Sequence, residues 1–265
     1  MKNKINISKI YLFLIMAFFY LPIVYVILFS FNESRSLTNF TGFSLQWYEK
    51  MFSTRAMMES IYYTVVIAVI ATIVSTIVGT IVAIGLSKSS KIIRLFVNQV
   101  NNLPMMNPDI VTAIGLMLLF STINVPTGFG TLLLAHIIFC IPYVILSVMP
   151  KLRQLDDDLM EAALDLGCTP FEALTKVIIP QIKAGIVSGA LVAFTMSFDD
   201  FVISYFTTGP GINNISTYVY ATTKRINPSV NALSTLIVLA ITIVLVIRNV
   251  VPLIRSRRIK NEEIA

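Results

Sequence analysis

Six long apolar runs constrain this chain of 265 residues more than any other feature of its sequence. A run of about 20 apolar residues can cross the hydrocarbon core of a membrane as an α-helix, and a helix satisfies its own backbone hydrogen bonds there. Hydrophobic residues make up 56% of the chain and charged residues only 13%. We therefore predict an all-α integral membrane protein with six transmembrane helices, at about residues 10–31, 61–86, 103–125, 131–149, 185–206 and 232–252.

The distribution of basic residues predicts how these helices are oriented. If both ends of the chain lie on one side of the membrane, the segments on that side hold 15 Lys and Arg residues and the segments on the other side hold five. Lys and Arg are enriched in the cytoplasmic loops of membrane proteins. We therefore expect a multi-pass protein with residues 1–9 and a basic tail, residues 253–265, in the cytoplasm. The net charge of +6 then reflects topology in a lipid membrane, and we expect no nucleic-acid partner.

One polar segment, residues 150–184, separates the fourth apolar run from the fifth. Within it, Asp158 and Glu161 have the spacing of a capping box, in which the first side chain accepts a hydrogen bond from an early amide of the helix. Gly167 can adopt the left-handed conformation that ends a helix. We expect a short helix between Asp158 and Gly167.

A second short helix is predicted directly after the first. Thr169 is followed by Pro170 and, three positions on, by Glu172, which is a capping box with proline at the first helical position. Proline disfavours helical geometry in the residue before it. We therefore expect this helix to end near Ile179, just before Pro180.

The helix–glycine–helix pattern resembles the cytoplasmic coupling loop of bacterial ABC-importer permeases. In that family the loop reads Glu-Ala-Ala, three residues, Gly, nine residues, Ile, one residue and Leu-Pro. The matching positions are Glu161, Ala162, Ala163, Gly167 and Pro180, and Val177 and Ile179 stand where Ile and Leu are usual. The resemblance implies a type I ABC importer permease fold over residues 61–252, with residues 150–184 as the loop that contacts a separate ATPase.

Four ionisable residues lie within the apolar core of the runs: Asp109, His136, Asp199 and Asp200. An acid at the middle of a membrane costs about 2.5–3.5 kcal/mol on insertion scales. Asp199 and Asp200 would be about 100° apart on one helix, so one could face a pathway while the other faces a neighbouring helix or water. Three acids and no basic residue within the membrane core suit a cationic substrate. The alternative is that each acid is protonated or hydrogen-bonded to a partner helix, and we expect His136 to be a packed, hydrogen-bonded histidine.

Further segments resemble the permeases of spermidine/putrescine importers, of the type called the C subunit. These segments are NPDIVTAIGL around Asp109, HIIFCIPYVI around His136, MSFDDFVISYFTTGP around Asp199, and NPSVNALSTL. The resemblance implies a polyamine importer of the bacterial inner membrane with two different permease subunits, two copies of an ABC ATPase and an external polyamine-binding protein. It also implies that the ATPase binds ATP and Mg²⁺, so this chain itself needs no cofactor.

Several catalytic motifs are missing from the sequence. It contains no G-x-x-x-x-G-K-[ST], no H-E-x-x-H and no G-x-S-x-G, and its two cysteines and one histidine form no metal-ligand spacing. We therefore predict a translocation subunit rather than an enzyme. The alternatives are a permease of the same class for iron or an anion, a secondary transporter with ion sites at Asp109 and Asp199, and a membrane enzyme.

Overall fold

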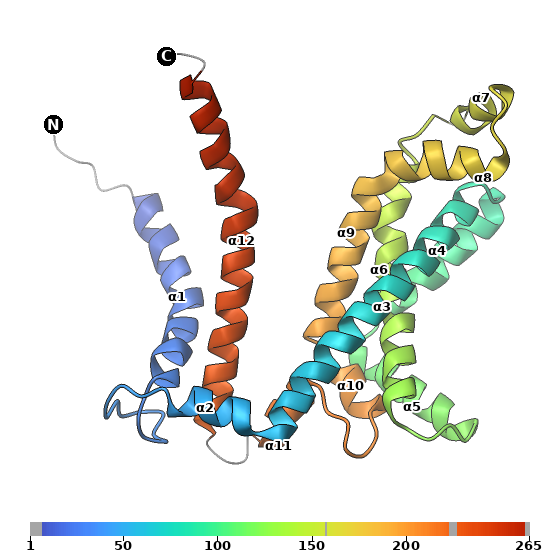
Figure 1. Ribbon diagram of the computed structural model, residues 1–265. Helices are drawn as coiled ribbons and strands as arrows, with labels where there is room; N and C mark the ends of the chain where they lie inside the picture. Colours follow the sequence, from blue (N-terminus) through green and yellow to red (C-terminus); the bar gives the residue numbers. More distant parts are fainter. Residues whose placement is uncertain (1–6, 157, 223–226, 263–265) are drawn as a thin grey trace. The chain divides into compact units, whose positions relative to one another are not determined.

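The computed structural model describes residues 7–156, 158–222 and 227–262, and apart from one β-bridge its regular elements are helices (Figure 1). The elements are α1 (Ile7–Ser30), α2 (Gln46–Ser53), α3 (Arg55–Ser87), α4 (Lys91–Met106), α5 (Asp109–Thr122), α6 (Phe129–Leu152), α7 (Leu159–Asp165), α8 (Pro170–Glu172), the π-helical η1 (Ala173–Ile178), α9 (Ile179–Phe198), α10 (Val202–Thr207), α11 (Ile215–Thr222) and α12 (Pro228–Glu262). Parts of the predicted N-terminal segment, outer loop and basic tail, at residues 1–6, 223–226 and 263–265, lie outside the described residues. The chain divides into two compact units, Glu59–Tyr218 and Met1–Met58 with Val219–Ala265.

Four helices are long and apolar enough to cross a membrane: Lys9–Ser30, Arg55–Ser87, Phe129–Leu152 and Pro170–Phe198. Two shorter apolar stretches, Asp109–Thr122 and Pro228–Val244, fall in the predicted third and sixth runs. The described residues therefore form an all-α membrane protein with at least four spans, and the count of six stays a prediction. The last helix, α12, continues past the predicted start of the tail at residue 253 and ends at Glu262.

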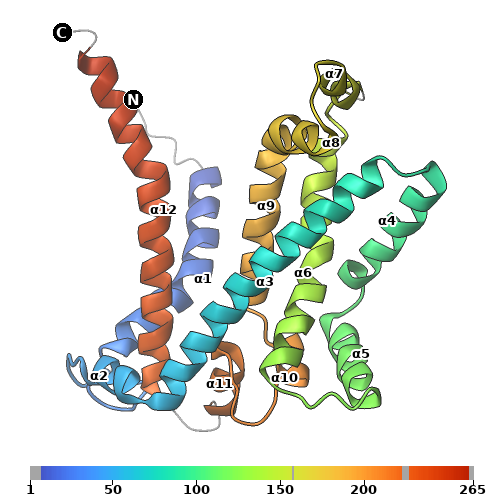
Figure 2. The same cartoon turned by 45° about the vertical axis from the view of Figure 1, so that its right-hand side comes forward.

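The predicted third run is not one continuous helix. The chain forms two separate helices, α4 and α5, joined by a short non-helical segment (Figure 2). Asn107, which precedes Pro108, has φ −82° and ψ 147°, because the proline ring excludes the helical region for the residue before it. Much of the predicted polar connection before this run is therefore helix α4, and Asp109 begins α5.

Glycines bring the helices of the unit Glu59–Tyr218 close together. A Cβ atom built on Gly185 of α9 would lie 3.0 Å from the carbonyl oxygen of Ser147 in α6, and one built on Gly189 would lie 3.2 Å from Cα of Val144. At the same residue of α6, a Cβ atom on Gly79 of α3 would lie 2.8 Å from the Val144 side chain. Small residues permit such close approach, so both α3 and α9 pack closely against α6.

In the other unit, the Asn32 side chain organises the segment that follows α1. Its Nδ2 donates to the carbonyl oxygens of Ser36 and Asn39, both at 2.9 Å, and its Oδ1 accepts from the Thr41 amide at 2.9 Å. Trp47 of α2 is buried and donates to the Asn32 carbonyl oxygen at 2.6 Å. Helix α12 packs against α1 and α2 in this unit.

Candidate functional site

The first candidate region is the loop of residues 150–184, in which α7 ends at a glycine in the left-handed conformation. Gly167 has φ 87°. Its amide donates to the Leu164 carbonyl oxygen at 2.9 Å, and the Cys168 amide donates to the Ala163 carbonyl oxygen at 3.1 Å. This pair of bonds is a Schellman motif, which satisfies carbonyls that the helix end leaves unpaired. The prediction that Gly167 ends the first loop helix is confirmed.

The capping box predicted at the start of α7 is wrong. Asp158 has φ −83° and ψ −6°, and within the described residues its side chain caps no amide. A capping side chain needs an extended backbone to reach the first amides, and Asp158 is already helical. Asp156 takes a related role, because its Oδ1 accepts from the Asp158 amide at 3.2 Å. Glu161 is exposed on α7.

The capping box predicted for the second loop helix is confirmed. Thr169 Oγ1 accepts from the Glu172 amide at 3.3 Å, Glu172 Oε2 accepts from the Thr169 amide at 3.0 Å, and Pro170 is the first helical residue. Glu172 Oε1 also pairs with Lys176 Nζ at 2.8 Å. The hydrogen bond from Lys176, followed by those from Thr169, lowers the pKa of Glu172 to about 2, and the same bond raises the pKa of Lys176. These solvated residues precede the predicted fifth span, so the pair mainly fixes the local geometry.

The predicted end of this helix at Ile179 is wrong. The chain continues from α8 through η1 into α9, and Pro170–Phe198 is one helix of 29 residues. Pro180 has no amide proton, and its ring conflicts with the carbonyl four residues earlier, which belongs to Lys176. The wider π-helical turn of η1 accommodates this carbonyl, so the helix passes Pro180 without ending. Val177 lies in η1, and Ile179 and Pro180 begin α9.

The loop exposes two large apolar side chains that the sequence analysis did not single out. Leu166 is 86% exposed and Phe171 is 73% exposed, on either side of the Gly167 turn. Figure 1 shows α7 and α8 beyond the ends of α6 and α9. Ala162 is exposed beside them, whereas Ala163 is buried. Exposed apolar groups on a projecting turn are typical of a surface that a protein partner covers. The sequence could have indicated these two residues, because both lie close to the glycine that was predicted to form the turn.

The second candidate region is the connection between α9 and α10, where the predicted continuous fifth span is wrong. Asp199 and Asp200 lie between the two helices. Asp200 Oδ1 accepts from the Ile203 amide at 3.2 Å, and Oδ2 accepts from the Ser204 amide at 2.7 Å. Aspartate competes with helical hydrogen bonding in this way. The two acids are therefore not 100° apart on one helix, and Asp200 satisfies the first amides of α10.

His136 of α6 completes a buried network around Asp200, and its Nε2 lies 3.6 Å from Asp200 Oδ2. Ser204 Oγ donates its single proton to Asp200 Oδ2 at 2.8 Å. The Ser204 oxygen therefore accepts from Asn214 Nδ2 at 2.7 Å and from His136 Nε2 at 2.9 Å. His136 Nδ1 lies 2.7 Å from Ser197 Oγ, so both ring nitrogens have hydrogen-bond partners. The expectation of a packed, hydrogen-bonded His136 is confirmed.

The sequence analysis missed the small polar partners in this network. Asn214 also donates to the Asp200 carbonyl oxygen at 3.0 Å, and its Oδ1 accepts from the Thr217 amide at 2.9 Å, at the start of α11. The amide that follows it, at Ile215, donates to Thr64 Oγ1 of α3 at 2.8 Å. Hydrogen bonds around Asp200 thus link α6, α9, α10 and the start of α11, and the neighbouring Ile215 amide adds a bond to α3.

The structure does not bring the three predicted acids together. Asp200 is buried, whereas Asp199 is exposed, and no other residue in the described ranges hydrogen-bonds to the Asp199 carboxylate. Asp109 is exposed in the first turn of α5, where the helix dipole favours a negative charge. Asp109 and Asp199 are therefore accessible to a solute or a partner, and Asp200 is not.

Comparisons of the sequence with a family model and with individual known proteins agree with one another. Residues 75–260 match the family described as "Binding-protein-dependent transport system inner membrane component". The chain is 36% identical over 244 residues to the spermidine/putrescine transport system permease protein PotC of Haemophilus influenzae, covering 91% of this chain and 95% of that one. It is 36% identical over 240 residues to the putrescine transport system permease protein PotI of Escherichia coli K12, covering 86% of this chain and 84% of that one.

A solved structure shows the same fold. The chain is similar to a chain of a bacterial ABC transporter involved in the import of the acidic polysaccharide alginate, with a TM-score of 0.69. The match covers 93% of this chain and 94% of that chain. Because the sequence identity is only 16%, the match shows the fold and not the function. The family match excludes the secondary transporter and the membrane enzyme that the sequence analysis left open. The chain belongs to the family of binding-protein-dependent transport system inner membrane components, and it is a permease subunit of a bacterial ABC importer, a translocation component rather than an ATPase.

Proposed function

We propose that the chain is the permease subunit of an ATP-driven importer of polyamines such as spermidine and putrescine. The observation that carries this proposal is the 36% identity to the H. influenzae spermidine/putrescine permease over 91% of the chain. The two exposed acids, Asp109 and Asp199, support it, because a polyamine is a polycation. A carboxylate in a poorly hydrated pathway attracts an ammonium group more strongly than in bulk water.

In this proposal the loop of residues 150–184 docks the ATPase. Leu166 and Phe171 offer exposed apolar area, and the Schellman turn at Gly167 holds them in place. Glu161 and Ala162 add an exposed face of α7, Ala163 packs that helix, and Val177, Ile179 and Pro180 join the loop to α9. The partner subunits are two copies of the ATPase, which hold ATP and Mg²⁺, a second permease that completes the pathway, and an external polyamine-binding protein.

The topology that fits this role has residues 61–252 as the permease domain, six spans, and both termini in the cytoplasm. It is supported by the 15 Lys and Arg residues on one side against five on the other. Helix α5 has 14 residues, fewer than the roughly 20 that a span needs, so part of α4 would complete the third span. A reporter active only in the cytoplasm should work after Ala265 and be silent after Gly211. The reverse pattern would rule out this topology.

The two adjacent acids have different roles in the proposal. Asp199 is exposed and meets the substrate, whereas Asp200 is buried and holds α10 to α6 through His136 and Ser204. Asp109 is the third acid available to the substrate, at the start of α5. This division follows from burial and hydrogen bonding, because a carboxylate that already accepts bonds from its own chain has little capacity left for an ammonium group.

The test is uptake of labelled spermidine and putrescine by the whole transporter reconstituted in vesicles, with its binding protein outside. Uptake should require ATP, and an ATPase that binds but does not hydrolyse ATP is the matched control. Ferric iron tests the alternative within the same class. ATP-dependent iron uptake without polyamine uptake would refute the substrate assignment while leaving the permease assignment intact.

A further inference from the structure

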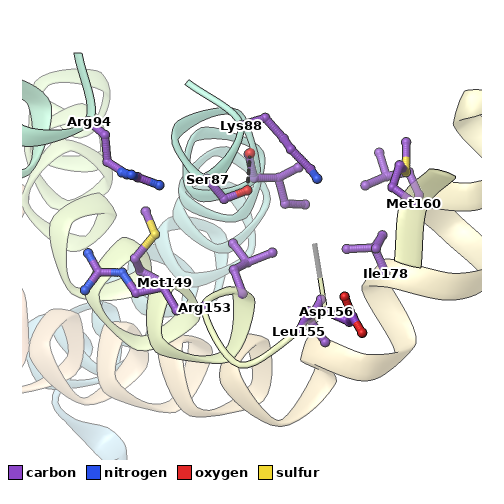
Figure 3. A pocket seen from close by; sticks show the side chains of 12 residues that line it. Ser87, Lys88, Arg94, Met149, Arg153, Leu155, Asp156, Met160 and Ile178 are labelled. Atoms are coloured by element: carbon purple, nitrogen blue, oxygen red, sulfur yellow. Dashed lines mark hydrogen bonds between the residues drawn. The ribbon is translucent and has the colours of Figure 1, made fainter. Parts of the chain in front are cut away.

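A cavity of about 280 Å³ lies at the end of the unit Glu59–Tyr218 that carries the loop of residues 150–184 (Figure 3). Its lining comes from the end of α3, the start of α4, the end of α6, the loop itself, α7 and η1. The cavity therefore joins the base of the loop to the α3–α4 connection, and nothing in the proposed function uses it.

The charged groups of the cavity are mainly cations. Lys88, Arg94 and Arg153 line it together with a single acid, Asp156. In Figure 3, Lys88 and Arg94 extend from the α3–α4 side, and Arg153 and Asp156 lie on the side of the loop. Within the described residues, none of the three cations forms an ion pair. Three cations against one acid give the cavity a net positive charge, which repels a polyamine and favours an anion.

The cavity also lies at the level where apolar helices end. The apolar helix α3 ends at Ser87, and α6 ends at Leu152. Lys88 and Arg153 are the residues that directly follow these two ends. Lys and Arg at such positions place their charged groups at the headgroup level of a membrane. The rest of the lining is largely apolar, with Met149, Met160 and aliphatic side chains of α3, α6 and η1.

We propose that this cavity binds the phosphate headgroup of an anionic phospholipid. The cations would hold the phosphate, and the apolar wall would contact the start of the acyl chains. Basic pockets between membrane helices recognise anionic headgroups in this way. A bound lipid would connect the α3–α4 connection to the base of the loop, so the lipid composition of the membrane would affect the assembled transporter. The polyamine assignment is not needed for this proposal.

The first test measures the lipid that copurifies with the assembled transporter from membranes containing phosphatidylglycerol. Replacing Lys88, Arg94 and Arg153 together by Gln should lower the retained phosphatidylglycerol at least tenfold, since each cation near an anionic headgroup contributes about fivefold. Lys91→Gln is the matched control, because Lys91 is an exposed cation on the same helix as Arg94 but does not line the cavity. Asp156→Asn should raise retention. Equal retention by the triple variant and the wild type would overturn the proposal.

The second test separates the possible sources of the anion. Inorganic phosphate or ATP should not displace the lipid, because neither satisfies the apolar wall; displacement by either at millimolar concentration would overturn the lipid assignment. ATPase binding is then measured in vesicles of phosphatidylethanolamine alone and in vesicles with one fifth phosphatidylglycerol. The triple variant should differ from the wild type only with phosphatidylglycerol. An equal loss of ATPase binding in both vesicles would assign the cations to the ATPase interface instead.

Discussion

Two interruptions lie at the two ends of the helix Pro170–Phe198, and their hydrogen bonds differ in range. The turn at Gly167, before the helix begins, is exposed, and its bonds connect neighbours in sequence, such as the Gly167 amide and the Leu164 carbonyl oxygen. The break at Asp200, after the helix ends, is buried, and its bonds reach His136 and Asn214 on distant elements through Ser204.

This difference in range predicts that one interruption matters mainly for folding and the other mainly for association with a partner. Local bonds fix the shape of the exposed turn itself, so a change there alters the surface offered to a partner more than the packing of the unit. Long-range bonds attach α10 to the helices around it, and an unpaired polar group there costs stability because no water replaces the lost partner. Changes at the buried break should therefore act on folding, and changes at the exposed turn should act on partner binding.

The largest effect is expected from Asp200→Asn. The Asn side chain has one oxygen to accept from the Ile203 and Ser204 amides and the Ser204 hydroxyl, so at least one buried donor stays unpaired. We expect a loss of about 3 kcal/mol in stability, measured as a lower melting temperature and a lower yield of assembled transporter. Asp199→Asn is the control and should assemble normally. Normal melting of the Asp200 variant would show that the network does not stabilise the break.

Gly167→Val is expected to have the second largest effect. A β-branched residue at φ 87° is strained, at a cost of roughly 1–3 kcal/mol, which the loop can escape only by changing the shape of the turn. ATPase binding to the otherwise assembled permease should fall about tenfold or more in a pull-down titration. Gly167→Asn is the matched control, because asparagine tolerates the left-handed region, and it should bind nearly as well as the wild type. Equal binding by the two variants would remove the turn from the docking surface.

Asp199→Asn should reduce transport without changing assembly. The substitution keeps the size of the side chain and removes its charge, and a loss of about 1.4 kcal/mol in transition-state stabilisation lowers the rate tenfold. Uptake of spermidine is measured per assembled transporter, so that expression does not enter the result. Asp109→Asn provides the comparison with the other exposed acid. If both variants transport at the wild-type rate, neither acid acts on the substrate.

The smallest effect is expected at the capping box of the second loop helix. The pKa of Glu172 is lowered to about 2 by Lys176 and Thr169, so the local stabilisation is complete above the ordinary carboxyl pKa and is lost as the pH falls through about 2. Lys176→Met should raise the midpoint of the Glu172 carboxyl titration, measured by NMR on permease with labelled glutamate. A midpoint that does not move would show that the Lys176 bond does not form in solution.

The exposed turn could largely be predicted from the sequence, because its bonds are local. The roles of Gly167, Thr169 and Glu172 follow from residue type and spacing alone. The role of Asp158 could not be predicted, because its conformation depends on the preceding residues. The Asp156 side chain accepts a hydrogen bond from the Asp158 amide. The π-helical turn was also missed, because Pro180 indicates a conflict in the helix but not whether the helix ends or widens.

The buried break could not be predicted, because its hydrogen bonds are long-range. A hydroxyl in an apolar helix commonly bonds to its own backbone, as Thr195 does to the Leu191 carbonyl oxygen at 2.9 Å. Nothing local distinguishes that threonine from Ser197 or Ser204, which bond to His136. The acids were visible as unusual residues in an apolar run, but which of them is buried depends on how α6 and α10 pack.

The π-helical turn has a mechanical consequence. It keeps the chain helical over 29 residues, from the loop to the residue before Asp199, while the helix turns sharply between α8 and α9 (Figure 1). A flexible connection at Pro180 would absorb a push on the loop as local bending. A bend that stays helical instead passes the push from α8 to α9 as a tilt or a rotation, so a displacement of the loop would reach Asp199 within the same motion.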